Sequence, residues 1–369
     1  MSSKRQGKDT LAPLRLAHSR LVGAPFSSPE AAVEWFGAVQ AQDFSGAKWA
    51  LAQRVRDCNE ARADEAFRSG KILRTHVLRP TWHFVRPADI RFLLELSAAR
   101  VKRVLLPYDR KLAIDAALLR KSHASITKAL LGGHFLTREE LAARLARAGI
   151  EASGQRLAHL VMHAELDAVV VSGPRRGKQF TYALFDERVP ASKPLTREEA
   201  LAALAERYFT SHGPASAQDF AWWSGLTVTD AKRAAASAGK RVTERTIGDK
   251  TYFGAFGRRP KAAPGPIVRL LPNYDECVIA FKDYTPVLDP ALRARMSEHR
   301  AVFAQHLVVV DGLVVGGWRR EIEKSRVRVE VTLLSKMPAQ VKAALAHEAE
   351  RFASFLGLTL LLELSVVSP

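Results

Sequence analysis

Between residues 119 and 190, apolar positions follow the 3.6-residue period of amphipathic helices in three successive sets. The sets are Ile126, Ala129 and Leu130, then Leu141, Leu145 and Ala148, and then Leu157, Leu160, Val161 and Ala164. Thr137 and Glu140 have the spacing of a capping box at the start of the middle helix. Two strand-like segments, 168–172 and 180–184, follow around a basic turn. Three helices and a hairpin are the order of a winged helix.

The same order occurs in the segments on either side. The later segment has predicted helices at about 197–212, 216–224 and 228–238 and a hairpin at 241–253 with the turn Gly248-Asp249-Lys250. The earlier segment has predicted helices at about 14–22, 29–39, 47–55 and 59–68 and a wing-like alternation over 72–85. We therefore predict three tandem winged-helix units, at 10–118, 119–190 and 191–260.

Beyond Pro266 the pattern changes to short apolar runs, which predict strands. The runs are 267–271, 278–281, 307–310, 313–318 and 326–334, and they precede a helix at 338–356 and a strand at 359–366. Asp311-Gly312 is a hairpin-turn sequence. Proline-rich linkers are predicted at 186–194, 257–266 and 285–290. The fold class is thus α+β, with a β-rich C-terminal domain at 261–369.

Composition narrows the kind of partner. Hydrophobic residues make up 47% and charged residues 25% of the 369 residues, which excludes general disorder and fibrous architectures. Lys and Arg number 56 against 38 Asp and Glu, so the formal net charge is +18. Such an excess favours a polyanion, because binding phosphates releases condensed counterions. Nucleic acid and an anionic membrane surface are the two candidates.

Targeting signals and cysteines favour a cytoplasmic protein that does not enter membranes. The most apolar stretch, 356–367, is too short to span a bilayer and contains Glu363. Residues 1–9 are basic but lead into no apolar segment of a secretory signal. Cys58 and Cys277 lack metal-ligand spacing, so we expect two reduced thiols.

Signatures of nucleotide-driven, zinc-peptidase and α/β-hydrolase enzymes are absent from the sequence. His159 and His163 have the i, i+4 spacing of metal ligands, but no cysteine or carboxylate ligand motif accompanies them. We interpret them as packing or surface residues and expect neither a metal nor a cofactor.

Gln40 and Gln42 form an unusual pair beside Asp43, where a helix should end. In an extended segment the two side chains project to the same side. Their amides do not titrate, but each offers an acceptor and two donors with which to hold a water molecule. Asp43 is the expected cap or turn residue, with assistance to the glutamines as the alternative. Paired glutamines in a loop are more often surface or capping groups.

The pair belongs to a wider set of motifs. They are Gln40-Ala-Gln42-Asp43, Trp49-Ala-Leu51, Arg74-Thr-His76-Val-Leu-Arg-Pro-Thr-Trp-His83, His212-Gly-Pro, Asp219-Phe-Ala-Trp222, Leu271-Pro-Asn-Tyr-Asp275 and Gly317-Trp-Arg-Arg320. Together they resemble the AlkZ-like winged-helix DNA glycosylases over nearly the whole chain. Relatives of the YcaQ-like branch carry aspartate at the second motif position, so Gln42 places this chain closer to the AlkZ branch.

The resemblance implies a concave, C-shaped basic DNA-binding surface and Gln40 and Gln42 as catalytic residues. It implies excision of bulky N7-alkylated purines, including interstrand crosslinks, from double-stranded DNA, in base excision repair or in self-resistance to alkylating antibiotics. No lysine other than Lys48 lies beside the motif, so we expect a monofunctional enzyme that leaves an abasic site. We also expect the protein to be a monomer. An open site that does not fully flip the base is our further hypothesis.

Candidate DNA contacts fall on the predicted wings. They are His76, Arg79, Trp82 and His83 in the first unit, Arg175, Arg176 and Lys178 at the second wing tip, and Arg319 and Arg320 on a C-terminal hairpin. Trp82 can instead fill the core, and the second wing tip can be a merely solvated turn. The alternative function is a non-catalytic winged-helix DNA-binding protein such as a transcription regulator, which would use the same surface for affinity alone.

Overall fold

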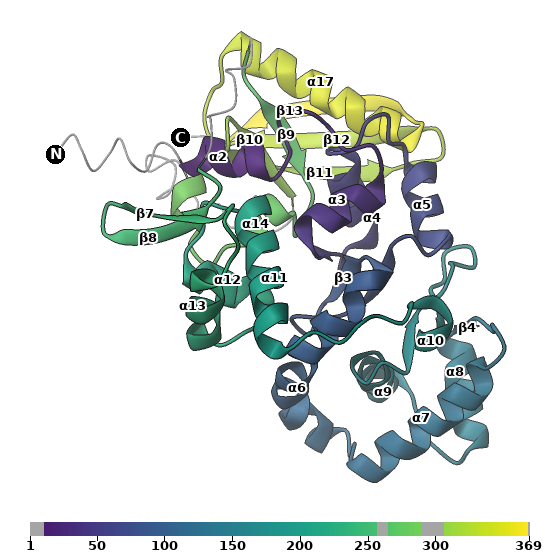
Figure 1. Ribbon diagram of the computed structural model, residues 1–369. Coiled ribbons are helices and arrows are strands. Elements are labelled where there is room, and N and C mark those ends of the chain that lie inside the picture. Colours follow the sequence, from purple (N-terminus) through teal and green to yellow (C-terminus); the bar gives the residue numbers. More distant parts are fainter. Residues whose placement is uncertain (1–10, 257–264, 289–305, 368–369) are drawn as a thin grey trace.

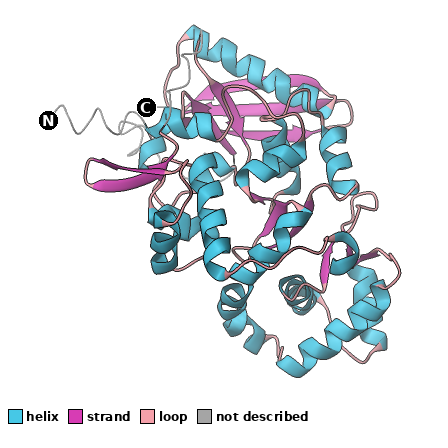
Figure 2. Cartoon of the chain, viewed as in Figure 1, coloured by secondary structure: helices cyan, strands magenta, loops and turns pink. Residues whose placement is uncertain are grey.

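The computed structural model describes residues 11–256, 265–288 and 306–367 of the chain. Helices alternate with strands that form four sheets within those residues, so the protein is α+β as the sequence predicts (Figure 2). The basic residues 1–9 and most of the linker predicted at 257–266 lie outside the described residues. No helix in the described ranges is long and apolar enough to cross a bilayer.

The first part of the chain surrounds a three-stranded antiparallel sheet with the order β1-β3-β2. Its elements are α2 (Leu11–His18), α3 (Pro29–Phe36), β1 (Val39–Gln40), α4 (Phe44–Ala52), α5 (Glu60–Arg68), β2 (Leu73–His76) and β3 (Trp82–Val85). The helix predicted to reach residue 39 ends at Phe36, because Gly37 has a φ of 82° and closes it. A long helix, α6 (Pro87–Lys111), follows the sheet and was not predicted.

The second part contains the three helices and the hairpin that periodicity predicts. Its elements are α7 (Ala116–Leu130), β4 (Leu136–Thr137), α8 (Arg138–Arg147), α9 (Gly154–Leu166), β5 (Val170–Ser172), β6 (Thr181–Leu184) and α10 (Phe185–Arg188). The capping box of Thr137 and Glu140 is present at the start of α8. This part occupies the end of the molecule opposite the five-stranded sheet (Figure 1).

The third part again has three helices and a hairpin. Its elements are α11 (Arg197–Ser211), α12 (Ala217–Ser224), α13 (Val228–Ala236), β7 (Thr243–Ile247) and β8 (Lys250–Gly254). The β7–β8 hairpin projects from the body of the molecule (Figure 1), and most of β7 is exposed. The predicted turn at Gly248 is confirmed, since this glycine has a φ of 68° between the two strands.

The C-terminal part is a five-stranded sheet with the order β13-β12-β11-β10-β9, covered on one face by α17 (Figure 1). Its elements are β9 (Val268–Leu271), α14 (Glu276–Ile279), the 3₁₀ turn η1 (Thr285–Val287), β10 (His306–Val310), β11 (Leu313–Ile322), β12 (Arg326–Leu333), α17 (Ala339–Leu356) and β13 (Thr359–Val366). The strand predicted at 278–281 is wrong. That segment begins as a short helix, because the Asp275 side chain accepts the Cys277 N–H at 2.9 Å and caps it.

Helix α4 ties the first part to the C-terminal sheet. Trp49 is buried against Phe352 and Phe355, and its Nε1–H donates to the Leu270 carbonyl at 2.8 Å. Just beyond the end of α4, Arg54 forms a bidentate pair with Asp275, at 2.9 and 2.7 Å, and both side chains are 1% exposed. The parts of the chain therefore meet through specific buried polar contacts as well as through apolar packing.

Replacing Arg54 with methionine should lower the free energy of unfolding by about 3–5 kcal/mol, because Asp275 would stay buried without its partner. Urea unfolding followed by circular dichroism measures this loss. Arg68→Met is the control, since the Arg68–Glu65 pair is mostly exposed and its loss should cost less than about 1 kcal/mol. Equal losses in the two variants would contradict the importance of the buried pair.

Candidate active site

The Gln-x-Gln segment is the connection between β1 and α4. Gln40 pairs with His83 of β3, and the Ala41 N–H donates to the Trp82 carbonyl at 2.7 Å. Asp43 then caps α4 by accepting the Gly46 N–H at 3.0 Å, as the sequence predicts. A Cβ at Gly46 would lie 2.6 Å from Asp43 Oδ2, so a larger residue there would displace the capping carboxylate.

Gln40 is buried and held at two points. Its Oε1 accepts from Arg79 Nη2 at 2.6 Å, and its backbone N–H donates to Glu276 Oε1 at 2.7 Å. The other oxygen of Glu276 accepts from His212 Nε2 at 3.1 Å and from Trp223 Nε1 at 2.9 Å. The α11–α12 region and α14 therefore fix a residue of the first sheet.

Gln42 lies in a different environment from Gln40. Its side chain is exposed, and its Oε1 accepts the Trp82 backbone N–H at 3.4 Å. No hydrogen bond joins the two glutamine side chains in the described part of the chain. The segment thus presents one amide that is anchored in the protein and one that is open to solvent.

Arg74 is a second arginine that supports the segment. Its Nε donates to the Ala41 carbonyl at 3.0 Å, and its guanidinium lies over the rings of Trp82, at 4.2 Å, and Phe180, at 4.6 Å. Burial lowers the pKa of Arg74 to about 10, and burial also lowers the pKa of Arg79. Two desolvated guanidinium groups therefore flank the motif.

His76 and His83 were expected to contact DNA, and the structure contradicts direct contact because they are only 2% and 0% exposed. His76 donates through Nδ1 to the buried Glu165, and its ring lies tilted against that of Trp82 with 4.4 Å between ring centroids. His83 donates through Nδ1 to the Thr81 carbonyl at 2.9 Å. Burial and then the nearby Arg79 hold the pKa of His83 well below its usual value, so the ring is neutral. Both histidines are therefore internal supports: His76 packs against Trp82, and His83 lies within β3.

The second wing tip approaches the start of α4. Arg175 lies over the rings of Phe44, at 5.0 Å, and Phe180, at 5.2 Å. Arg176 pairs with Glu140 at 2.7 Å, which partly neutralises it, whereas Lys178 is exposed. Of the three, Arg175 and Lys178 are thus free of ion pairs with acidic side chains in the described structure.

The C-terminal hairpin also reaches the motif. Arg320 Nη2 lies 3.3 Å from Asp43 Oδ2, whereas Arg319 is exposed and lies 3.4 Å from Glu330. Beside Arg320, His306 accepts the Asn273 N–H on Nδ1 at 2.7 Å. Burial, and then the charge of Arg320, lower the pKa of His306 to about 4.

The histidine pair on α9 binds a carboxylate. His159 Nδ1 lies 3.0 Å from one oxygen of Asp109, and His163 Nε2 lies 2.9 Å from the other. No group of three or more candidate ligands for a metal occurs among the described residues. Cys58 and Cys277 are free thiols, and burial raises the pKa of each to about 11.

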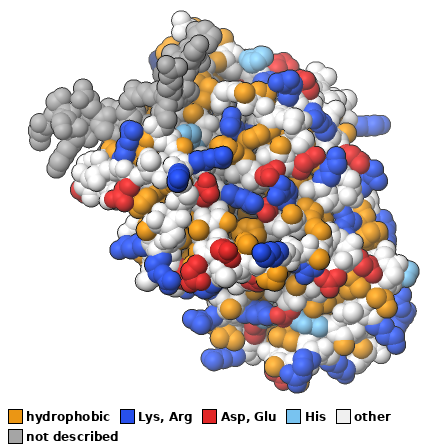
Figure 3. Space-filling view, viewed as in Figure 1, with side chains coloured by type: hydrophobic (Ala, Val, Ile, Leu, Met, Phe, Trp, Pro, Cys, Tyr) orange, Lys and Arg blue, Asp and Glu red, His pale blue; other side chains and the backbone are white. Residues whose placement is uncertain are grey.

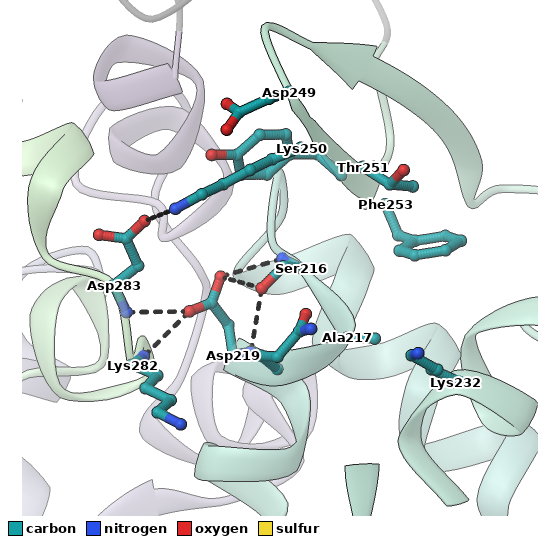
Figure 4. A pocket seen from close by; sticks show the side chains of 12 residues that line it. Ser216, Ala217, Asp219, Lys232, Asp249, Lys250, Thr251, Phe253, Lys282 and Asp283 are labelled. Atoms are coloured by element: carbon teal, nitrogen blue, oxygen red, sulfur yellow. Dashed lines mark hydrogen bonds and ion pairs between the residues drawn. The ribbon is translucent and has the colours of Figure 1, made fainter. Parts of the chain in front are cut away.

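A pocket of about 330 Å³ adjoins Trp82, the residue that contacts Gln42. It is lined by Arg74, Trp82, Thr137, Arg138, Glu139, Lys178, Gln179, Phe180 and Tyr182. A larger hollow of about 780 Å³ lies between α12 and the β7–β8 hairpin, where Asp219 caps α12 and Lys250 pairs with Asp283 (Figure 4). None of its lining residues belongs to the Gln-x-Gln segment, so size alone does not locate the candidate site.

Three supporting residues were not singled out from the sequence as parts of the site. Arg74, Arg138 and Glu276 are separated by long stretches of chain and come together only through tertiary packing. Arg74 is the first residue of the motif at 74–83, and Glu276 directly follows the motif at 271–275. Their proximity to these motifs is the one sequence feature that could have indicated their role.

Comparison with known proteins gives consistent results. Residues 33–355 match the family described as DNA glycosylase AlkZ-like. The chain is 26% identical over 295 residues to the interstrand DNA cross-link repair glycosylase of Streptomyces sahachiroi, covering 76% of this chain and 79% of that protein. The solved structure of Streptomyces sahachiroi DNA glycosylase AlkZ has a similar fold, with a TM-score of 0.78 and 23% identity over 98% of this chain and 99% of that one.

Because the pKa of His306 is about 4 in the fold and near 6.5 in an unfolded chain, the unfolded state takes up the proton first on acidification. His306 therefore contributes stability above pH 6.5 that is lost as the pH falls toward 4. Between pH 7.5 and pH 5.0 the wild type should lose about 1–2 kcal/mol more than His306→Asn, which keeps an acceptor but does not titrate. Urea unfolding at the two pH values measures this, and identical losses would contradict the assignment.

Proposed function

The chain belongs to the AlkZ-like DNA glycosylase family, and we propose that it hydrolyses the N-glycosidic bond of bulky N7-alkylated purines in double-stranded DNA, leaving an abasic site. We include interstrand crosslinks among its substrates, because the curated relative is a cross-link repair glycosylase. The observation that carries the proposal is the Gln-x-Gln segment itself, which presents one anchored and one exposed amide and is held by the buried Arg74 and the partly buried Arg79.

The chemistry suits a site built from neutral amides. Alkylation at N7 makes the guanine a cationic leaving group, so the C1′–N9 bond breaks with less assistance than in a normal nucleoside. The protein then has to place a water molecule and stabilise an oxocarbenium-like transition state. In our proposal Gln42 binds the water from the solvent side, and the second lone pair of Gln40 Oε1 directs it toward C1′.

Arg79 and Glu276 are positioning residues in this scheme. Arg79 fixes the orientation of the Gln40 amide by binding its Oε1, and Glu276 holds the backbone at the same residue. Glu276 also adds a buried negative charge near the developing oxocarbenium ion.

A monofunctional reaction is supported by the position of Lys48. Its Nζ contacts Glu60 at 2.7 Å and Asp64 at 2.8 Å, and the side chain is 3% exposed. An amine that is charged, paired and buried is a poor nucleophile for a Schiff base with the sugar. We therefore propose hydrolysis by water, with no metal and no cofactor.

We further propose that the three helical parts are winged helices that contribute to a concave, basic, C-shaped DNA-binding surface in a cytoplasmic monomer. The proposed contacts are Arg79, Trp82, Arg175, Arg176, Lys178, Arg319 and Arg320. Lys and Arg side chains are spread over the face seen in Figure 3, in keeping with an extended backbone footprint. The exposure of Gln42 supports an open site that accepts a bulky adduct without enclosing a flipped base.

Gln40→Ala and Gln42→Ala should each reduce single-turnover excision of an N7-alkylguanine adduct by about 10- to 1000-fold. The double variant should be little worse than the weaker single variant, since residues that serve one water act as a unit. Abasic sites are converted to strand breaks by alkali and counted on a gel. Gln340→Ala, at an exposed position of α17, is the control and should retain full activity.

Undiminished excision in both single variants would overturn the catalytic assignment. If instead the wild type binds DNA and excises none of a panel of N7 monoadducts and crosslinks, the non-catalytic DNA-binding alternative gains support.

Gln42→Asp separates water binding from charge. Aspartate keeps an acceptor, removes the amide donors and adds a titratable group, so we expect partial activity with a new acidic limb in the pH–rate profile. Single-turnover rates between pH 5 and 8 test this. A profile parallel to that of the wild type would count against contact between residue 42 and the reacting water.

A further inference from the structure

Arg74 is a buried cation without a counter-ion. Its side chain is 7% exposed, and its only side-chain hydrogen bond within the described structure runs from Nε to the Ala41 carbonyl. It forms no ion pair with any described carboxylate. Burial lowers the pKa of Arg74 and the charge of Glu165 opposes this shift, but the Glu165 carboxylate is hydrogen-bonded to His76. Arg54 is the informative contrast, because it is also buried but has a bidentate carboxylate. Burial of a guanidinium without such a partner is costly.

Arg74 lines the 330 Å³ pocket beside Trp82, and its two terminal nitrogens form no hydrogen bond with the described residues. Two further cations line it, Arg138 at the first position of α8 and Lys178 at the second wing, and neither forms an ion pair in the part of the chain that is described. Glu139 is the single acidic lining residue and is exposed. The charged side chains of the wall are three cations and one anion, so the pocket has a net charge of about +2.

The aromatic side chains of the pocket contact two of its cations. Trp82 is covered by the Arg74 guanidinium at 4.2 Å and faces Arg138 at 6.0 Å, and the Tyr182 hydroxyl accepts from Arg138 at 3.4 Å. The cations therefore converge from β2, α8 and the second wing on one fixed space.

We propose that this pocket binds a single backbone phosphate of the DNA strand that carries the lesion. The inference rests on the proposed glycosylase function. A guanidinium fork with two free amino groups matches the oxygens of a phosphodiester, and the anion supplies the counter-charge that Arg74 lacks. Arg74 then links DNA binding to the motif, because its Nε donates to the Ala41 carbonyl while its terminal nitrogens bind the phosphate. Phosphate binding sets the register of the strand against Gln42.

The first test uses undamaged duplex DNA and so does not depend on excision. Affinity is measured by fluorescence anisotropy at several salt concentrations for Arg138→Gln, Lys178→Gln and the double variant. Each single variant should reduce the log–log salt slope by up to about 1, and the double variant also by about 1, because one phosphate is lost. Arg147→Gln, on the exposed far end of α8, is the control and should leave the slope unchanged.

Unchanged slopes in all variants would overturn the proposal. If affinity fell while the slope stayed the same, the proposal would also fail, and the result would indicate a nucleobase in the pocket. A fall of about 2 in the double variant would mean two separate phosphates and would also overturn it.

The second test locates the phosphate. Single methylphosphonates, which are neutral, are placed in turn around an N7-alkylguanine, and single-turnover excision is measured under subsaturating protein. Wild-type excision should fall at one position by about 10-fold or more, and the same substitution should cost the Arg138→Gln/Lys178→Gln variant nothing further. Arg74→Gln should behave like the double variant, which keeps the test valid if Arg74→Gln does not fold. An equal loss in wild type and double variant would refute the site. Absence of wild-type excision would refute the proposed function and leave the salt-slope test standing.

Discussion

Two arginines, Arg74 buried and Arg79 partly buried, hold the segment on which the site depends. Arg79 binds the side chain of Gln40, and Arg74 binds the carbonyl of Ala41. Neither arginine forms an ion pair with a carboxylate among the described residues. The hydrogen bonds of their side chains are made to the motif. These contacts add to the backbone pairing with Trp82 and to the Asp43 cap, which also fix the loop. The cost of burying two such cations has to be met by packing elsewhere in the fold.

That packing comes from every part of the chain. Ser172 of the second part accepts the Arg74 N–H at 2.8 Å, and Glu276 of the C-terminal part accepts the Gln40 N–H at 2.7 Å. His212 and Trp223 of the third part complete the Glu276 contacts, and Arg320 reaches Asp43 from the C-terminal sheet. The motif is therefore organised only when all four parts are folded together. This dependence gives a physical reason for the long, multi-part chain around so small a chemical centre.

Local sequence signals predicted the regular elements well. Capping residues such as Thr137 and turn residues such as Gly248 act within a few positions, and the helices and hairpins they delimit are present. Signals failed where tertiary contacts decide. The run at 278–281 looks like a strand, but the Asp275 cap turns its start into a helix, and α6 was missed although it spans 25 residues. The sequence suggested that His76 and His83 contact DNA, but both are buried. His76 binds Glu165, which is distant in sequence, and His83 lies in the central strand of the sheet. Glu276 is adjacent to Gln40 only in space.

The central claim is that two neutral amides, not an ionisable base, position the attacking water. The most direct measurement is the pH–rate profile of wild-type single-turnover excision on a duplex with one defined N7-alkylguanine, taken between pH 5.5 and 9 and compared with Asp43→Asn. The account predicts a rate that changes by less than about 3-fold across the range and is similar in the variant, because neither glutamine titrates. A limb of unit slope in the wild type that disappears in Asp43→Asn would contradict it and identify the carboxylate as the base.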